Sequence, residues 1–358
     1  MRRRAFLSLG AAAAATGQPT FERVLRLESG LSVVSVAPGE GETPVLLASG
    51  PSSSYIIHHF NGDWRREPLP EAASSVSSSQ GAFWIAARSG IFTRAAGGAK
   101  WQKRWEGEGL EHIVFIGPKG YAAGAGKTIL EYGEDGEWRR IPAADEPTTN
   151  TANTAYHWIS FLTPRVGVIS GASRPPRKGR TESYPAWLDP DRASRRKEWP
   201  GASVTLETRD AGLTWRHSVT SIFGKITRVR YARDGRGLAL VEFHDEFEYP
   251  SEVFAIDLKS GSSERVFRRK DRAVTDTWLF SGLGCLATVH PTAAPDRPGA
   301  VSVYISNELR DWTEYVLQGV TGNRVWLAAT PQGVLWLATD SGFLCRSSEP
   351  LAGTKGLR

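Results

Sequence analysis

Short runs of alternating apolar and polar residues recur along almost the whole chain. In each repeat an apolar segment is followed by a turn with glycine, then by a second and a third segment. In most repeats a polar turn that ends near tryptophan comes next. Residues 113–115, 120–124 and 128–132 show this order before the turn at 135–137. Alternation with a period of two predicts β-strands. Its recurrence at a period of 20–50 residues indicates a repeat architecture.

The same order of segments can be followed to the end of the chain. It recurs at 158–161, 167–171 and 204–208; at 226–231, 237–241 and 253–257; at 278–280, 284–289 and 301–306; and at 325–328, 333–338 and 343–346. Two fainter units fill residues 30–69 and 72–105. The count predicts an all-β, seven-bladed β-propeller with four-stranded antiparallel blades, with six or eight blades as alternatives. The last unit lacks an outer strand, which residues 21–27 are expected to supply, closing the ring.

One polar turn has more distinctive residue types than the others. Residues 208–215 read Thr-Arg-Asp-Ala-Gly-Leu-Thr-Trp, and the residues that suit a tight hairpin are Thr208, Asp210, Gly212, Thr214 and Trp215. An aspartate in this place can accept hydrogen bonds from the N–H groups of its own turn. The glycine can adopt the positive φ that such a turn requires. The tryptophan can fold back over the turn and cover the neighbouring sheet.

Weaker copies of this turn are found elsewhere. Trp64, Trp101 and Trp138 stand 37 residues apart, each after a short polar turn that contains glycine, and Trp312 follows a copy without glycine. The pattern of residues 208–215 resembles the Asp-box (BNR repeat) of sialidase-like β-propellers. The chain around it resembles the photosystem II assembly factor family. The resemblance implies that these turns join the third and fourth strands, opposite the ligand face, but it implies no activity because one fold supports many functions.

The first 18 residues have the character of a targeting segment. Arg3 and Arg4 precede a short apolar run that ends in alanines, which resembles a twin-arginine export signal (Tat export). We therefore expect residues 1–18 to be a signal peptide and residues 19–358 to be one propeller domain with a basic insertion at 172–203. The mature protein is expected to be a periplasmic or extracellular monomer. No later apolar run is long enough for a transmembrane segment.

Charge and cysteine content narrow the expected partners. The formal net charge is +6; residues 174–200 hold eight basic and four acidic residues, which is +4 of that total. Basic and acidic residues are nearly equal in number in the rest of the chain, so we expect no nucleic-acid partner.

The two cysteines are expected to be structural. Cys285 and Cys345 lie in apolar strand patterns, and we favour buried thiols over a disulfide. We expect no metal site, since no His/Cys cluster has ligand spacing, and no cofactor.

The first candidate site is the beginning of the innermost strands. Aligning the units on Phe115, Phe161, Tyr231, Phe280 and Ala328 brings one set of residues into register: Glu111, His157, Thr227, Asp276 and Arg324. The next positions hold His112, Trp158, Arg228, Thr277 and Val325. These residues are expected to ring the axis and to bind a polar or anionic ligand or do acid–base chemistry. Of the three hypotheses for these residues, we favour a rim of mutually paired charges, then ligand binding, and catalysis last.

The second candidate site is formed by long loops. Tyr184, Trp187 and Trp199 lie among the basic residues of the 172–203 insertion, and His244 lies in an acidic segment at 242–252. Both loops, with 290–300, are expected beside the axial mouth. Basic groups interleaved with aromatic ones can bind an anion or a carbohydrate. The alternative, that the acidic loop pairs with the basic one, stays open.

The sequence thus predicts an exported, non-catalytic binding or assembly scaffold that recognises a protein or a glycan on the face with the long loops. The alternative is a sialidase-like glycoside hydrolase, which two carboxyl groups flanking a cleft at the spacing of glycosidases would support. Only Glu111, Asp276 and the acidic residues of 242–252 are available for that role. Residues 140–142 match the Arg-Ile-Pro motif of sialidases, but they follow Trp138 and are expected on an outer strand. We name no catalytic residue.

Overall fold

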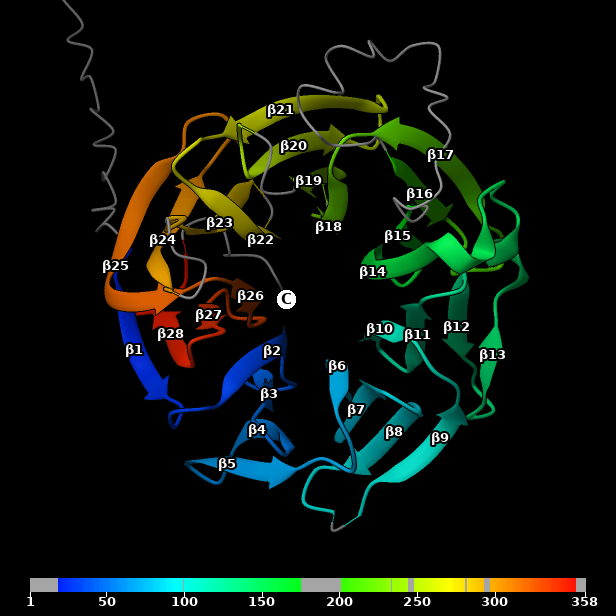
Figure 1. Cartoon of the computed structure of the whole chain (residues 1–358), viewed down its shortest axis with the longest axis horizontal. Coiled ribbons are helices and arrows are strands. Elements are labelled where there is room, and N and C mark those ends of the chain that lie inside the picture. The colour runs from blue at the N-terminus through cyan, green and yellow to red at the C-terminus, as the bar shows by residue number, and fades with distance from the viewer. Residues whose placement is uncertain are drawn as a thin grey trace, which may run out of the picture.

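The computed structural model describes residues 19–98, 100–174, 201–232, 234–243, 248–280, 282–292 and 297–351. These residues form seven four-stranded antiparallel sheets around a common axis (Figure 1). The predicted seven-bladed β-propeller is therefore confirmed.

Each of the first six blades is one continuous stretch of chain, with its innermost strand first. Blade 1 contains β2 (Ser32–Ala37), β3 (Val45–Ser49), β4 (Ser54–Phe60) and β5 (Asp63–Pro68). Blade 2 contains β6 (Ala73–Ser79), β7 (Ala82–Ala87), β8 (Gly90–Ala95) and β9 (Gln102–Glu106). Blade 3 contains β10 (Leu110–Ile116), β11 (Lys119–Gly124), β12 (Thr128–Tyr132) and β13 (Trp138–Arg140).

Two short 3₁₀ helices, η1 (Pro142–Asp145) and η2 (Thr151–Asn153), lead into blade 4. Blade 4 contains β14 (Thr154–Thr163), β15 (Val166–Ser173), β16 (Gly201–Thr208) and β17 (Arg216–Ile222). Blade 5 contains β18 (Lys225–Tyr231), β19 (Arg236–Glu242), β20 (Ser251–Asp257) and β21 (Ser262–Arg268). Blade 6 contains β22 (Ala273–Phe280), β23 (Leu283–Val289), β24 (Gly299–Ser306) and β25 (Thr313–Gly322).

Blade 7 is built from both ends of the chain. It contains β26 (Val325–Ala329), β27 (Leu335–Thr339), β28 (Phe343–Ser347) and, as its outer strand, β1 (Phe21–Arg26). β1 runs antiparallel to β28, with Phe21 opposite Ser347 and Arg26 opposite Phe343. The predicted closure of the ring by the beginning of the chain is confirmed. Such pairing covers the strand edge that the last blade otherwise exposes.

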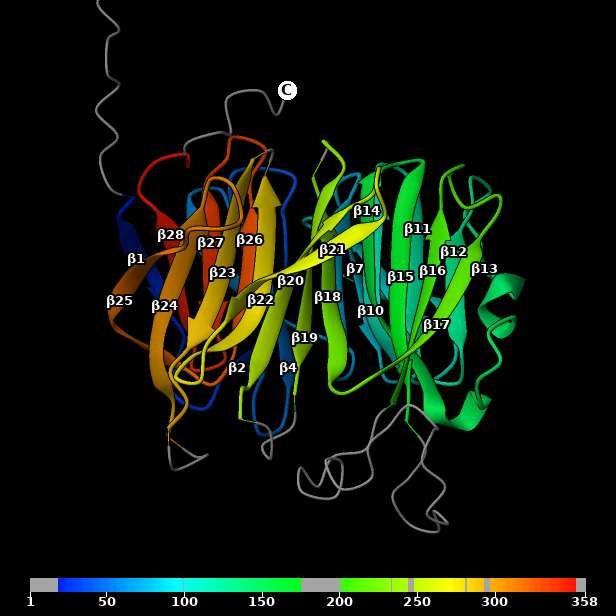
Figure 2. The ribbon, with the colours of Figure 1, turned by 90° about the horizontal axis from the view of Figure 1, so that it is seen from above.

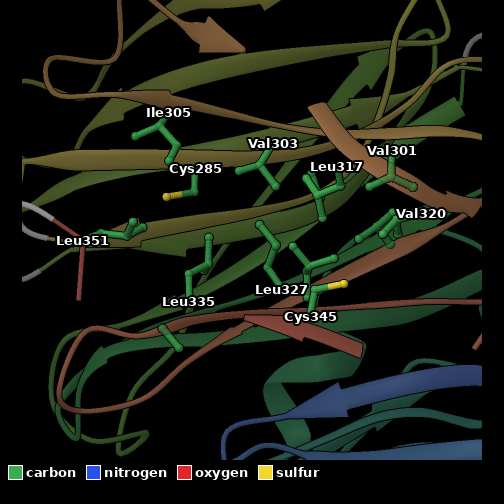
Figure 3. Packing of buried hydrophobic residues seen from close by; sticks show 14 of the residues in the cluster. Cys285, Val301, Val303, Ile305, Leu317, Val320, Leu327, Leu335, Cys345 and Leu351 are labelled. Carbon is green, nitrogen blue, oxygen red and sulfur yellow. The ribbon is translucent and has the colours of Figure 1, made fainter. Parts of the chain in front are cut away.

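The hydrophobic core lies between neighbouring blades. The largest cluster joins blades 6 and 7 through β23, β24 and β26–β28 (Figure 3). Cys285 and Cys345 both lie in it as buried free thiols. Burial raises the pKa of both, to about 11 for Cys345. No helix in the described part of the chain is both long and apolar enough to cross a bilayer.

The repeated tryptophans occupy corresponding places. Each of the five lies within one residue of the beginning of the fourth strand of its blade: Trp64, Trp101, Trp138, Trp215 and Trp312. Each also contacts the preceding blade. Trp101 Nε1 donates to Pro68 O at 3.3 Å and Trp312 Nε1 donates to Val266 O at 3.0 Å. These side chains therefore link successive blades, which explains their spacing in the sequence.

The turn after β16 has the predicted local geometry. Asp210 Oδ1 accepts from the backbone N–H of Thr214 and from Thr208 Oγ1, both at 2.9 Å, and Oδ2 accepts from Thr214 Oγ1 at 2.5 Å. Hydrogen bonds from Thr214 lower the pKa of Asp210 to about 2. Gly212 adopts φ +84°. The aspartate thus organises the turn, and the glycine permits its backbone conformation.

The two ends of the ring differ in what they carry (Figure 2). We call the end at which the inner strands begin the start face and the opposite end, which carries residues 208–215, the turn face. On the start face Ser173 lies opposite Thr154 and Ala202, and Val289 lies opposite Ala273 and Val301. The three longest connections between second and third strands therefore leave from the start face, as expected.

Candidate functional site

A β-bulge lies near the beginning of the inner strand in blades 1 to 6. The ladder shifts by one residue at each of these places, and the extra residues are Val34, Ser74, Glu111, His157, Thr227 and Thr275. A bulge bends the strand and re-aims a side chain. Three of the residues that the sequence placed in register, Glu111, His157 and Thr227, occupy this bulge position.

The register expected for Asp276 was wrong by one residue. In blade 6 the bulge residue is Thr275, so Asp276 corresponds to Arg228. Leu279, opposite Gly284, corresponds to Tyr231, opposite Gly237. Phe280 is aromatic like Tyr231 and so suggests the equivalent position, but it lies one residue further along, opposite Leu283.

Several bulge side chains join one blade to the next. They donate a hydrogen bond to a carbonyl at the start of the next inner strand: Ser74 Oγ to Leu110 O at 2.8 Å, His157 Nε2 to Ile226 O at 2.5 Å, and Thr275 Oγ1 to Val325 O at 3.0 Å. Burial and, to a lesser degree, the nearby Lys225 together lower the pKa of His157 to about 3. His157 is therefore a neutral link between blades 4 and 5 near neutral pH.

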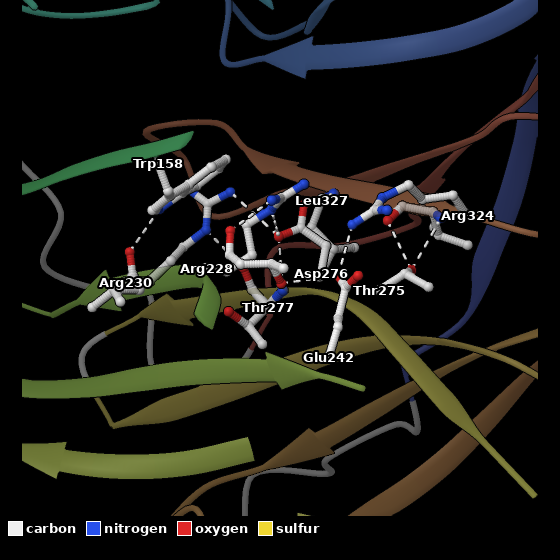
Figure 4. Close-up of polar contacts among 12 residues, drawn as sticks. Trp158, Arg228, Arg230, Glu242, Thr275, Asp276, Thr277, Arg324 and Leu327 are labelled. Carbon is white, nitrogen blue, oxygen red and sulfur yellow. Dashed lines mark hydrogen bonds and ion pairs between the residues drawn. The ribbon is translucent and has the colours of Figure 1, made fainter. Parts of the chain in front are cut away.

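Asp276 is the most tightly held acid of the site (Figure 4). Its side chain is 2% exposed, and its oxygens accept from the backbone N–H groups of Thr277 and Leu327, each at 2.8 Å. Arg228 Nε lies 3.4 Å and Arg230 Nη2 lies 3.7 Å from Oδ1. This carboxylate thus has two backbone donors and two neighbouring cations, so its role is structural.

Two tryptophan rings cover the arginines that face Asp276. The Arg228 guanidinium lies 4.3 Å from the ring centre of Trp158, and Arg230 lies 4.9 Å from Trp158 and 4.2 Å from Trp278. Burial lowers the pKa of both arginines, to about 10 for Arg230, so Arg230 stays charged at neutral pH. Arg230 is a site residue that the sequence pattern did not predict. Its spacing of two residues from Arg228 on one strand, which puts both on the same face, was the available signal.

A second, more accessible group lies beside this one. Arg324 Nη2, at the start of blade 7, donates to Glu242 Oε1 of blade 5 at 2.7 Å, and Thr227 Oγ1 donates to the same oxygen at 2.9 Å. Lys225 makes no hydrogen bond or ion pair through its ammonium group within the described residues. Burial lowers the pKa of Lys225, while Glu111 and Glu242 oppose this shift.

We call Lys225, Arg228, Arg230, Glu242, Asp276 and Arg324 the axial cluster. It holds four basic and two acidic groups, and adding Glu111 makes the balance four to three. Glu111 is accessible to solvent, yet the protein around it still raises its pKa by desolvation, with Lys225 acting in the opposite direction. The site is therefore cationic, as an anion-binding site requires.

Most candidates from the long loops fall outside the part of the chain that the structure describes. Tyr184, Trp187, Trp199 and His244 lie outside the described residues. In the acidic segment, Glu252 pairs with Arg268 of its own blade at 3.0 Å. Arg140 ends the outer strand β13, as expected. Within the described ranges no three His, Cys, Asp or Glu side chains are grouped so that they could hold a metal ion.

The turn face carries cavities that the sequence did not predict. One of about 310 Å³ lies where the inner strands end and is lined by residues that include Leu162, Tyr231 and Trp278. Another of about 440 Å³ lies between blades 4 and 5 and also includes Leu162 and Tyr231. Both depend on how blades meet, which no local pattern reports.

No protein-family model and no curated protein matches this chain. Solved β-propeller structures do. YCF48 bound to a D1 peptide matches over 91% of this chain and 96% of that one, at 12% identity and a TM-score of 0.59. Virginiamycin B lyase from Staphylococcus aureus matches over 92% and 99%, at 12% identity and a TM-score of 0.57. The WD40 propeller domain of Doa1 matches over 92% and 97%, at 10% identity and a TM-score of 0.57. At these identities the likeness shows the fold.

Proposed function

We propose that this protein is a non-catalytic propeller that binds an acidic segment of a partner protein at the axial cluster. The observation that carries the proposal is the state of Lys225, a half-buried ammonium group without an ion-pair partner in the described structure. Glu242, opposite Lys225 in the sheet, is paired with Arg324, which has 37% of its side chain exposed. An unpaired, partly desolvated cation is costly unless a ligand supplies an anion.

The acids of the site support binding over hydrolysis. A glycosidase needs one carboxyl group to donate a proton and a second to act as nucleophile or base. Asp276 is held by two N–H groups and two arginines, and Glu242 accepts from Arg324 and Thr227. Glu252 and Glu248 are paired with Arg268 and Lys270. Of the described residues offered for this role, that leaves Glu111, and one carboxyl group does not make the required pair.

A solved structure of similar fold supports a peptide as the ligand. A peptide is bound in the YCF48 structure, which is similar in fold, and the start face of this propeller could hold one as well.

We also propose that the protein is exported, because residues 1–18 carry a twin-arginine pattern. Export is tested by fusing these residues to a reporter and replacing Arg3 and Arg4 by lysine, which should keep the reporter inside the cell.

Binding is tested with a fluorescein-labelled peptide of six glutamates that ends in a neutral amide, with a six-glutamine peptide as the reference. Fluorescence anisotropy should show binding of the glutamate peptide that weakens as salt increases. Lys225→Gln and Arg324→Gln should each weaken binding about three- to tenfold, by loss of one charge-assisted contact. Lys259→Gln, which removes an exposed charge from the turn face, should change nothing. Equal affinity for both peptides, or an equal effect of all three substitutions, would overturn the proposal.

A further inference from the structure

We propose that Glu242 is a built-in competitor for the acidic ligand: it occupies Arg324 until an acidic side chain of the partner displaces it. This inference rests on the proposed function. It assigns Glu242 a regulatory role and makes Arg324 the exchangeable half of the axial cluster.

The two acids of the axial cluster are held in different ways. Asp276 accepts from two backbone N–H groups and has 2% of its side chain exposed. Glu242 accepts only from side chains, those of Arg324 and Thr227, in the described structure, and 25% of its side chain is exposed. Breaking the Asp276 contacts would open the joint between blades 6 and 7. Releasing Glu242 needs only a change of rotamer.

The position of Glu242 also fits exchange. It is the last residue of β19 and lies opposite Lys225 and Ser251 in the sheet. Its carboxylate nevertheless extends to Arg324 of blade 7, past the start of blade 6 (Figure 4). Once released, it can turn to solvent or toward the unpaired Lys225. An incoming carboxylate then meets the same guanidinium that Glu242 occupied.

Such competition lowers the apparent affinity by the fraction of molecules in which Arg324 is free. A partly exposed ion pair of this kind stabilises the state in which Glu242 occupies Arg324. Its free energy corresponds to a loss of about fivefold in the affinity for the ligand. Removing the Glu242 charge should therefore strengthen binding of an acidic peptide, although Glu242 itself contacts no ligand in this scheme.

The test measures the affinity of the six-glutamate peptide for Glu242→Gln, which should increase about fivefold. Glu252→Gln is the matched control, because it removes the same charge from the same blade but frees Arg268 on β21. Its affinity should stay within twofold of the unsubstituted protein. Thermal unfolding of each variant shows whether the fold is kept.

Thr227→Val separates release of Glu242 from a simple change in net charge. It removes the hydroxyl that holds Glu242 and leaves every charge in place, so affinity should rise about twofold. It also carries the test should Glu242→Gln fail to fold. Unchanged or weaker binding by both variants, with normal binding by the unsubstituted protein, would overturn the competitor and leave the proposed function intact. Absence of peptide binding in every form would overturn both.

Discussion

The carboxylate of Asp276 accepts a hydrogen bond from the backbone N–H of Leu327 at 2.8 Å. A side chain of blade 6 thus satisfies a backbone donor on the inner strand of blade 7. Three other groups hold the same carboxylate: the N–H of Thr277 and the guanidinium groups of Arg228 and Arg230. An acid that the sequence offered as a ligand contact is therefore part of the joint between two blades.

We predict that Asp276→Asn destabilises the protein by about 3–5 kcal/mol, because it leaves two buried guanidinium groups without their counter-ion. Denaturant unfolding followed by tryptophan fluorescence measures the free energy of unfolding. Glu242→Gln should cost about 1 kcal/mol or less in the same assay, since its ion pair is partly exposed. Equal losses for the two variants would contradict the distinction between a fixed and an exchangeable acid.

The turn at residues 208–215 should make stability depend on pH. The pKa of Asp210 is lowered from its usual 3.8 to about 2 by hydrogen bonds from Thr214. The folded state thus favours the charged carboxylate, whose contribution is complete above pH 3.8 and is lost as the pH falls through 2. Asp210→Asn should lower the melting temperature at pH 7 and have progressively less effect toward pH 2. A constant difference across this range would show that the charge of Asp210 plays no part.

Two glycines in equivalent turns separate backbone strain from steric contact. Gly62 and Gly212 adopt φ +90° and +84°. A Cβ added at Gly62 meets nothing within 4 Å, whereas one at Gly212 meets Tyr121 Oη at 2.8 Å. Gly62→Ala should cost about 1–2 kcal/mol for its left-handed backbone, and Gly212→Ala should cost more. Chemical denaturation of both variants decides this, and a smaller loss for Gly212→Ala would contradict it.

Ring closure can be tested through cysteine reactivity. Cys345 of β28 lies opposite Arg23 of β1, while Cys285 lies within blade 6. Both thiols are buried with raised pKa values, so neither should react with an alkylating reagent in the folded protein. Deleting residues 19–26 should increase labelling of Cys345 well before that of Cys285, as mass spectrometry would detect. Equal labelling of the two would indicate that β1 does not protect the last blade.

Much of this architecture was predictable because it is local. Strand alternation, glycine in turns and the spacing of Trp64, Trp101 and Trp138 each depend on residues close together in sequence, and the same unit recurs seven times in the described chain. Even the role of residues 21–27 followed from counting strands. The bulge at Thr275 was not predictable, because the shift in register depends on how β22 pairs with β23.

The sequence by itself determined the number of blades, the order of strands within them and the turn organised by Asp210, since each rests on contacts within a few tens of residues. Only the tertiary structure decided which charges meet at the axis. Arg324 and Glu242 are separated by 82 positions in the chain, and they pair because the curvature of the ring brings the start of blade 7 beside the end of β19. Charge pairing across a closed ring depends on distances in space, and a strand pattern carries no information about those.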